Sequence, residues 1–273
     1  MCDEGRFGFH WMDEGRLTRV RHRGADSTWE DALAAISATL RMLRDGGTGA
    51  RLAVIASAQL SNEELFLIEK IFGALGARVT ACVPTPAGYS DDFLIKADKN
   101  PNTLGARLLG LSGPDAPDAA AIIDEAVKED GRIEALWIFG HDLTTLVGGE
   151  KLEALSRKLR LFIFSGTNDH PGTACAHWVL PTAAYVEKDG TFVNCHGRIQ
   201  RIGRAFPAVS DSREDWRLLL DIARQLDQPL PWSHPREIFL GLAQAVPEFG
   251  GLNYETIGSQ GAWLNTRAKQ PSS

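Results

Sequence analysis

An alternation of short apolar runs with helical segments constrains the fold of this chain more than any other feature. The runs have the length of strands and are continuously apolar, which is typical of strands buried on both faces of a parallel sheet. They cover residues 52–57, 78–83, 135–140 and 161–165, and helical patterns at 61–75, 119–129 and 150–159 alternate with them. We therefore predict an α/β fold with a doubly wound, mostly parallel sheet flanked by helices, preceded by an irregular N-terminal segment.

Capping signals predict where several helices begin. Residues 29–43 have helical spacing, with Ser27 or Thr28 as the N-cap, and Ser61 opens an S-x-x-E capping box. Ser212 is predicted to cap a strong amphipathic helix. Asp189-Gly190 is typical of a tight turn with positive φ. Further predicted elements are helices at 102–109, 213–226 and 236–245, a strand at 177–180, a hairpin of 191–193 with 198–202, and a loop over 84–101.

Composition and charge exclude some classes of function. The 273 residues carry a net charge of −6, which argues against a dedicated nucleic-acid binder. No run of 18 apolar residues occurs, so we expect no membrane insertion, and the first residues lack the apolar core of a signal peptide. The four cysteines form no C-x-x-C pair, which favours reduced thiols in a cytoplasmic setting. One basic cluster, of Arg16, Arg19, Arg21 and Arg23, is interpreted as a solvated β edge, with a docking surface for an acidic partner as the alternative.

Three of the predicted strands end in polar residues. These ends are Ser57 to Gln59, Gly140 to Asp142 and Ser165 to His170. Ligands of open parallel sheets bind beyond the carboxyl ends of strands, so the three segments could line one crevice. The favoured interpretation is that they cap the helices that follow, a role for which Asp142 and Asn168 are suited.

Other candidate sites are weaker. His170, Cys175, His177, Cys195 and His196 have side chains that bind zinc, but their spacing matches no short motif, and isolated thiols more often pack as small hydrophobes. The run Gly46 to Gly49 precedes a strand instead of following one, so it cannot present amides to a phosphate at a helix start. The sequence offers Glu187 no second acid or base for catalysis. No specific NAD or ATP signal is present.

Several stretches resemble a known family. These are Cys2 to Phe9 (CDEGRFGF) with Arg16 to Arg19, Asp92 to Asp98, Val179 to Pro181, Glu187 to Asn194 (EKDGTFVN) with Gly197 to Gln200, and Asp215-Trp216. Together they resemble the large electron-transfer subunit of NADH-quinone oxidoreductase (respiratory complex I), within the molybdopterin oxidoreductase superfamily. The resemblance covers roughly residues 2 to 245.

The resemblance implies a division of the chain and a role. Residues 1–26 would be the end of an iron-sulfur segment, 27–245 a molybdopterin-oxidoreductase-like α/β domain, and 246–273 a tail that frays beyond Gly258. Cys2 would be the final thiolate of a [4Fe-4S] cluster, but only if residues upstream of an N-terminally truncated chain, or another chain, supply the other ligands, because such a cluster needs four. Whether Met1 is a true start stays open.

The expected function is that of an electron-transfer and scaffold subunit, in the peripheral arm of an NADH:quinone oxidoreductase. We expect no molybdopterin and no catalytic residue in the chain, because no molybdenum ligand and no closing C-terminal barrel can be identified. Expected partners are the other peripheral-arm subunits, with no nucleic acid and no direct membrane insertion, on the cytoplasmic face of the membrane. The alternative is a small molybdopterin- or nucleotide-binding oxidoreductase that uses the strand-end crevice.

Overall fold

The computed structural model describes residues 8–83, 87–93, 95–145 and 147–265. The predicted α/β fold is confirmed. In this part of the chain the main sheet has the order β2-β1-β7-β6-β5-β3-β4. Its strands are β1 (Arg21–His22), β2 (Ala25–Asp26), β3 (Leu52–Ser57), β4 (Arg78–Cys82), β5 (Ala135–Phe139), β6 (Leu161–Gly166) and β7 (Trp178–Pro181). Strands β3 to β7 pair in parallel, and β1 pairs antiparallel with β7 and with β2.

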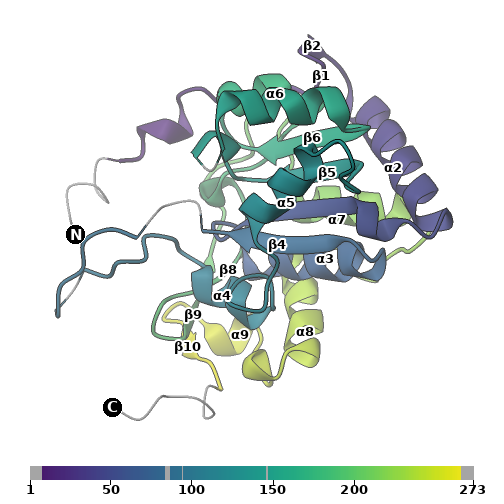
Figure 1. Cartoon of the computed structure of the whole chain (residues 1–273). Helices are drawn as coiled ribbons and strands as arrows, with labels where there is room; N and C mark the ends of the chain where they lie inside the picture. The colour runs from purple at the N-terminus through teal and green to yellow at the C-terminus, as the bar shows by residue number, and fades with distance from the viewer. Residues whose placement is uncertain (1–7, 84–86, 94, 146, 266–273) are drawn as a thin grey trace.

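Helices cover both faces of this sheet, as the continuously apolar strands require (Figure 1). Side chains alternate between faces along a strand. Val54 packs in a core with α2 (Trp29–Asp45), α3 (Asn62–Ala74) and α7 (Asp215–Gln225). Its neighbour Ile55 packs in a second core with α5 (Ala119–Val127) and α6 (Gly149–Lys158). The two faces therefore have separate hydrophobic cores.

The capping predictions hold for two helices and are wrong for the third. Thr28 accepts from the Asp31 amide at the start of α2, and Ser61 and Glu64 form the reciprocal capping box of α3. Helix α7 instead starts at Asp215, after an N-cap residue without a side-chain bond. The Ser212 hydroxyl donates to the Leu17 carbonyl, so it fastens the N-terminal segment instead of the helix.

A smaller sheet lies below the main one in Figure 1, beside α4 (Thr103–Leu108), α8 (Pro235–Ala245) and α9 (Tyr254–Ile257). It contains the predicted hairpin, β8 (Gly190–Val193) with β9 (Arg198–Ile202), and adds β10 (Ala262–Trp263). The predicted positive-φ turn at Asp189-Gly190 is wrong, since the glycines with positive φ do not include Gly190. Gly190 begins β8, where an added Cβ would lie 2.8 Å from the Ser61 Cβ. This glycine permits a close approach between elements.

The expectation that the chain frays beyond Gly258 is wrong for the segment up to Asn265. Strand β10 pairs antiparallel with β9, and Leu264 is buried in the core that also holds Ile257. Apolar side chains of this Gly-rich segment, such as Leu264, pack in the core and hold the segment in place. The three-part division of the chain stays a prediction. Among the described residues, we find no helix with the length and apolarity needed to cross a bilayer.

Candidate functional site: a crevice at the strand ends

The predicted strand ends line one crevice, with a cavity of about 670 Å³. Ser57 and Gln59 follow β3, Gly140 follows β5, and Gly166 to Asn168 end and follow β6. The segment Thr182 to Tyr185 after β7 lines it as well. Trp11, Leu60, Pro101, Lys188, Phe192 and Asp215 complete the wall. The crevice therefore lies where open parallel sheets bind ligands.

The N-terminal segment forms part of the rim. The Asn168 amide donates to the Trp11 and Glu14 carbonyls, each at 2.7 Å. Capping by Asn168 is therefore not observed: its side chain holds the N-terminal segment instead. Trp11 also lies near Tyr185, with ring centroids 6.1 Å apart. Asp142 does act as predicted, because it accepts from the Thr144 amide at the start of a short 3-10 helix.

Arg16 does not belong to a solvated edge. Its guanidinium donates to both Glu187 oxygens, at 3.0 and 2.7 Å, and each side chain is only 7% exposed. Further bonds run from Arg16 to the carbonyls of Met12 and Thr167. Arg19 and Arg21 do lie at the β edge, where Arg19 pairs with Asp26 and Arg21 pairs with Asp169. Arg23 follows β1 and has a positive φ. Bidentate pairing fixes geometry as well as charge, so Arg16 positions the rim segment.

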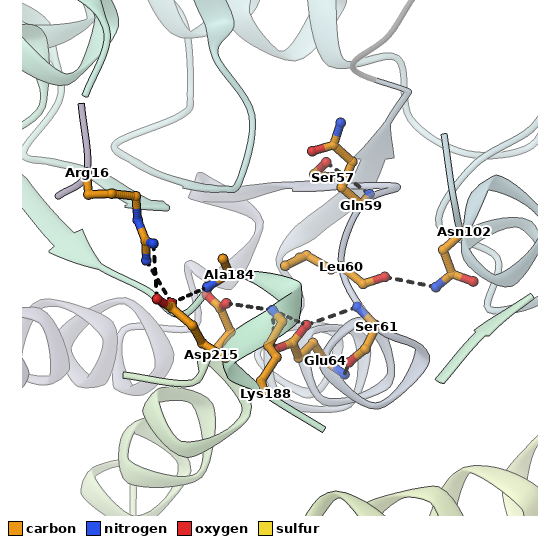
Figure 2. A network of polar contacts seen from close by, with 11 residues as sticks. Arg16, Ser57, Gln59, Leu60, Ser61, Glu64, Asn102, Ala184, Lys188 and Asp215 are labelled. Atoms are coloured by element: carbon orange, nitrogen blue, oxygen red, sulfur yellow. Dashed lines mark hydrogen bonds and ion pairs between the residues drawn. The ribbon is translucent and has the colours of Figure 1, made fainter. Parts of the chain in front are cut away.

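A buried ion cluster lies at the floor of the crevice (Figure 2). The Lys188 ammonium donates to both Glu64 oxygens, at 2.7 and 2.9 Å, and to Asp215 at 3.3 Å. Burial alone would lower the pKa of Lys188, but the charges of Glu64 and Asp215 outweigh it and raise the pKa. Burial raises the pKa of the Asp215 carboxyl, against the attraction of Lys188. Two carboxyls therefore share one ammonium, and the cluster has no net positive charge.

A second buried network joins β8 to α3. Glu63 accepts from the Thr191 amide and hydroxyl and from the Tyr254 hydroxyl, at 2.9, 3.0 and 2.9 Å. Burial raises the pKa of Glu63 to about 7, because these bonds only partly replace water. Asn102 accepts from the Val193 amide and donates to the Leu60 carbonyl in the crevice wall (Figure 2). Most polar side chains of the segment 187–191 are thus engaged inside the protein.

The candidate zinc set is not assembled. Among the described residues, no three His, Cys, Asp or Glu side chains are placed to hold a metal ion. His177 lies between the Phe162 amide and the Ser156 carbonyl, and His170 lies 3.0 Å from Asp142. Cys195 and His196 are exposed at the hairpin end. Burial raises the pKa of the Cys82 thiol to about 12. Cys2, the predicted cluster ligand, lies outside the described residues.

The strand order, the two helical layers and the crevice define a doubly wound α/β domain with a binding site of the open-sheet type. Comparison with known proteins narrows this class. Residues 99–225 match the molybdopterin oxidoreductase family, and this part of the chain is similar to a molybdopterin oxidoreductase domain. The matched region contains β5 to β9 and α7, and with them most of the crevice wall.

Full-length relatives are much longer than this chain. "Putative formate dehydrogenase SAR2393" of Staphylococcus aureus is 30% identical over 177 residues, which is 62% of this chain and 16% of the relative. "Putative formate dehydrogenase YrhE" of Bacillus subtilis is 28% identical over 137 residues, 50% of this chain and 14% of the relative. Among solved structures, acetylene hydratase from Pelobacter acetylenicus matches with a TM-score of 0.44 and 13% identity, over 53% of this chain and 20% of its own.

Sequence reasoning offered the crevice only as the alternative to helix capping, and it missed the charged floor. Glu64 was identified only as part of a capping box, and it serves both roles: Oε2 accepts from the Ser61 amide while both oxygens accept from Lys188. The usable signal was a lysine between two strongly apolar segments, since a lysine is almost never fully buried unless it is paired.

Proposed function

We propose that this chain is part of an electron-transfer and scaffold subunit in the peripheral arm of an NADH:quinone oxidoreductase, without a molybdenum site of its own. The observation that carries the proposal is that the polar side chains of the EKDGT segment, residues 187–191, pair with other residues of this chain. Glu187 is paired with Arg16, Lys188 with Glu64 and Asp215, and Thr191 with Glu63. Because these polar side chains pair inside the protein, the segment supports a structural role as part of a scaffold.

The charge of the crevice supports the same proposal. A pterin dinucleotide carries a pyrophosphate, which proteins hold with uncompensated cations or amides at helix starts. Among the described lining residues Lys188 is the one cation, and it is already shared by two carboxyls. The lack of a free cation among these lining residues supports the proposal that the crevice does not hold a polyanionic cofactor.

The test is the cofactor content of the purified chain and of its complex. We expect no molybdenum by elemental mass spectrometry, no pterin fluorescence after oxidation, and no NADH-ferricyanide activity of the chain alone. In a host with complex I, the tagged protein should copurify with peripheral-arm subunits. Stoichiometric molybdenum or pterin would overturn the proposal.

The Cys2 assignment needs its own experiment. We propose that Cys2 is a cluster ligand only together with cysteines from another part of the protein. Anaerobic reconstitution of the 273-residue chain with iron and sulfide should therefore yield no stable cluster. The same treatment of a protein extended by the upstream coding sequence should yield one, and Cys2→Ala should weaken it. A stable cluster on the chain alone would contradict the assignment.

The alternative function is a molybdopterin- or nucleotide-binding oxidoreductase. It is favoured by the position of the crevice at the strand ends and by the formate dehydrogenase names of the relatives. Under this alternative other domains would supply the missing cations. Binding of molybdopterin guanine dinucleotide to the longer protein, measured by copurification, separates the two functions.

A further inference from the structure

A histidine beside the crevice has two neighbours that make opposite demands on one of its ring nitrogens. His170 is the N-cap of the 3-10 helix η4 (Pro171–Cys175). Its Nδ1 accepts from the Gly172 amide at 3.1 Å, and the same nitrogen lies 3.0 Å from a carboxylate oxygen of Asp142. A ring nitrogen without a proton accepts from an N–H group, and a ring nitrogen with a proton donates to a carboxylate. The Nδ1 of His170 can therefore satisfy only one of these neighbours at a time.

The other side of the His170 ring faces an apolar cavity. His170 shares this small cavity with His141 and with apolar side chains of β5, β6 and α6. Within the described residues, the Nε2 of His170 and both ring nitrogens of His141 are buried without a hydrogen-bond partner. Burial also lowers the pKa of His141. Only the Nδ1 side of His170, next to Asp142, therefore offers an acceptor to an added proton.

The charged groups around His170 favour its protonated form, but burial opposes them more strongly. Burial lowers the pKa of His170, although the charges of Asp142 and Asp169 act against it. Helix α6 packs against η4, and its Glu153 acts on Cys175 at the other end of η4. His170 is therefore neutral at pH 7 and takes up a proton only in more acidic solution. A histidine of this kind gives stability that is present above its unfolded-state pKa and is lost as the pH falls.

The segment that leads into His170 holds the rim of the crevice. Its Asn168 side chain donates to two carbonyls of the rim, and its backbone exchanges two further hydrogen bonds with the rim, at 2.7 and 2.8 Å. These two bonds run from the Asp169 amide to the Gly15 carbonyl and from the Leu17 amide to the Thr167 carbonyl. A backbone movement at His170 therefore reaches Trp11, which lines the crevice.

We propose that His170 is a pH-operated latch for the rim segment, residues 11–17. At neutral pH its Nδ1 accepts from the Gly172 amide and keeps η4 and the segment 167–169 in place. In acid, Nδ1 takes up a proton from solvent and donates it to Asp142, so the Gly172 amide loses its acceptor. The segment 167–169 then loosens and the rim segment opens more often. The latch controls access to the crevice and does not depend on the proposed scaffold function.

The test follows the His170 ring and the rim in one sample. The full chain is titrated from pH 8 to pH 5, with nuclear magnetic resonance shifts of the imidazole ring for protonation and amide hydrogen exchange, corrected for the intrinsic rate, for opening. Protection of the Asp169 amide should fall at least about tenfold, with the midpoint of the His170 ring. Protection of Val54, in the central strand β3, should not change over this range.

Two variants separate the latch from a merely structural role. His170→Asn keeps a side-chain oxygen for the Gly172 amide but cannot titrate, so protection of Asp169 should no longer depend on pH. Asp142→Asn removes a negative charge that favours the protonated ring, so the midpoints of the His170 ring and of Asp169 protection should move together to lower pH.

The control variant is His196→Asn, at the exposed end of the hairpin, which should leave the acid response unchanged. Equal protection of Asp169 at pH 8 and pH 5 would overturn the inference. The same holds for an equal loss at Val54, which would show global unfolding, and for an unchanged acid response in His170→Asn. If the Asn variant does not fold, the wild-type titration and Asp142→Asn still decide, because the two midpoints must coincide in both proteins.

Discussion

Removing the ammonium group from the buried cluster should be among the most damaging single changes in this chain. Lys188→Met leaves Glu64 and Asp215 without their shared cation, and these side chains are 0% and 2% exposed. Breaking a buried ion pair on one side typically costs about 3 to 5 kcal/mol. Since three hydrogen bonds of 2.7 to 3.3 Å are lost together, we expect the upper part of that range.

The assay is urea unfolding at 25 °C and pH 7, followed by circular dichroism. Lys151→Met is the matched control, because Lys151 pairs with Asp124 on the surface and both side chains are about half exposed. Lys151→Met should lower the free energy of unfolding by less than about 1 kcal/mol. Adding Glu64→Gln and Asp215→Asn to Lys188→Met should restore part of the loss, since Gln keeps an oxygen for the Ser61 amide.

The loss of unfolding free energy caused by Lys188→Met should depend on pH, which gives a second test of the same argument. Without Lys188, the Asp215 carboxyl loses the positive charge that opposes the effect of burial, so its folded-state pKa rises further. A raised carboxyl pKa gives stability at low pH that is lost as the pH rises. The deficit of Lys188→Met should therefore shrink at pH 5. A deficit that equals that of Lys151→Met, or that does not change with pH, would refute the argument.

Three further predictions concern the rim, the second network and the close approach at β8. Arg16→Met should expose the rim segment, so that limited trypsin digestion cuts near Arg19 several times faster than in the wild type. Glu63→Gln removes a carboxyl whose pKa rises from 4.5 to about 7, equivalent to about 3 kcal/mol that is present below pH 4.5 and lost as the pH rises through 7. The wild-type advantage over this variant should therefore fall by about 2 to 3 kcal/mol between pH 5 and pH 8, and a constant difference would contradict the burial of the charge. Gly190→Ala should cost about 1 to 3 kcal/mol in urea unfolding through its contact with Ser61, while Gly149→Ala, with open space around it, should cost nothing; equal effects would disprove the close approach.

The regular elements were predictable because their signals are local. Continuous apolar runs marked β3, β5 and β6 within a residue of their observed ends, and the capping box at Ser61 marked the start of α3. The crevice was predictable as well, because the carboxyl ends of parallel strands meet at one edge of a sheet. Both inferences need only the order of elements along the chain.

The polar interior was not predictable, because each of its contacts joins residues far apart in sequence. Lys188 and Glu64 are 124 positions apart, and Arg16 and Glu187 are 171 apart. The same distance explains the error at Gly190: a D-G pair favours a tight turn locally, but the approach of Ser61 requires a residue without a Cβ at this position. A local turn signal and a long-range packing requirement select the same amino acid, and only the packing partner tells them apart. Charged residues in the EKDGT segment therefore looked like a surface turn, whereas they join the rim, the floor of the crevice and β8 into one buried framework.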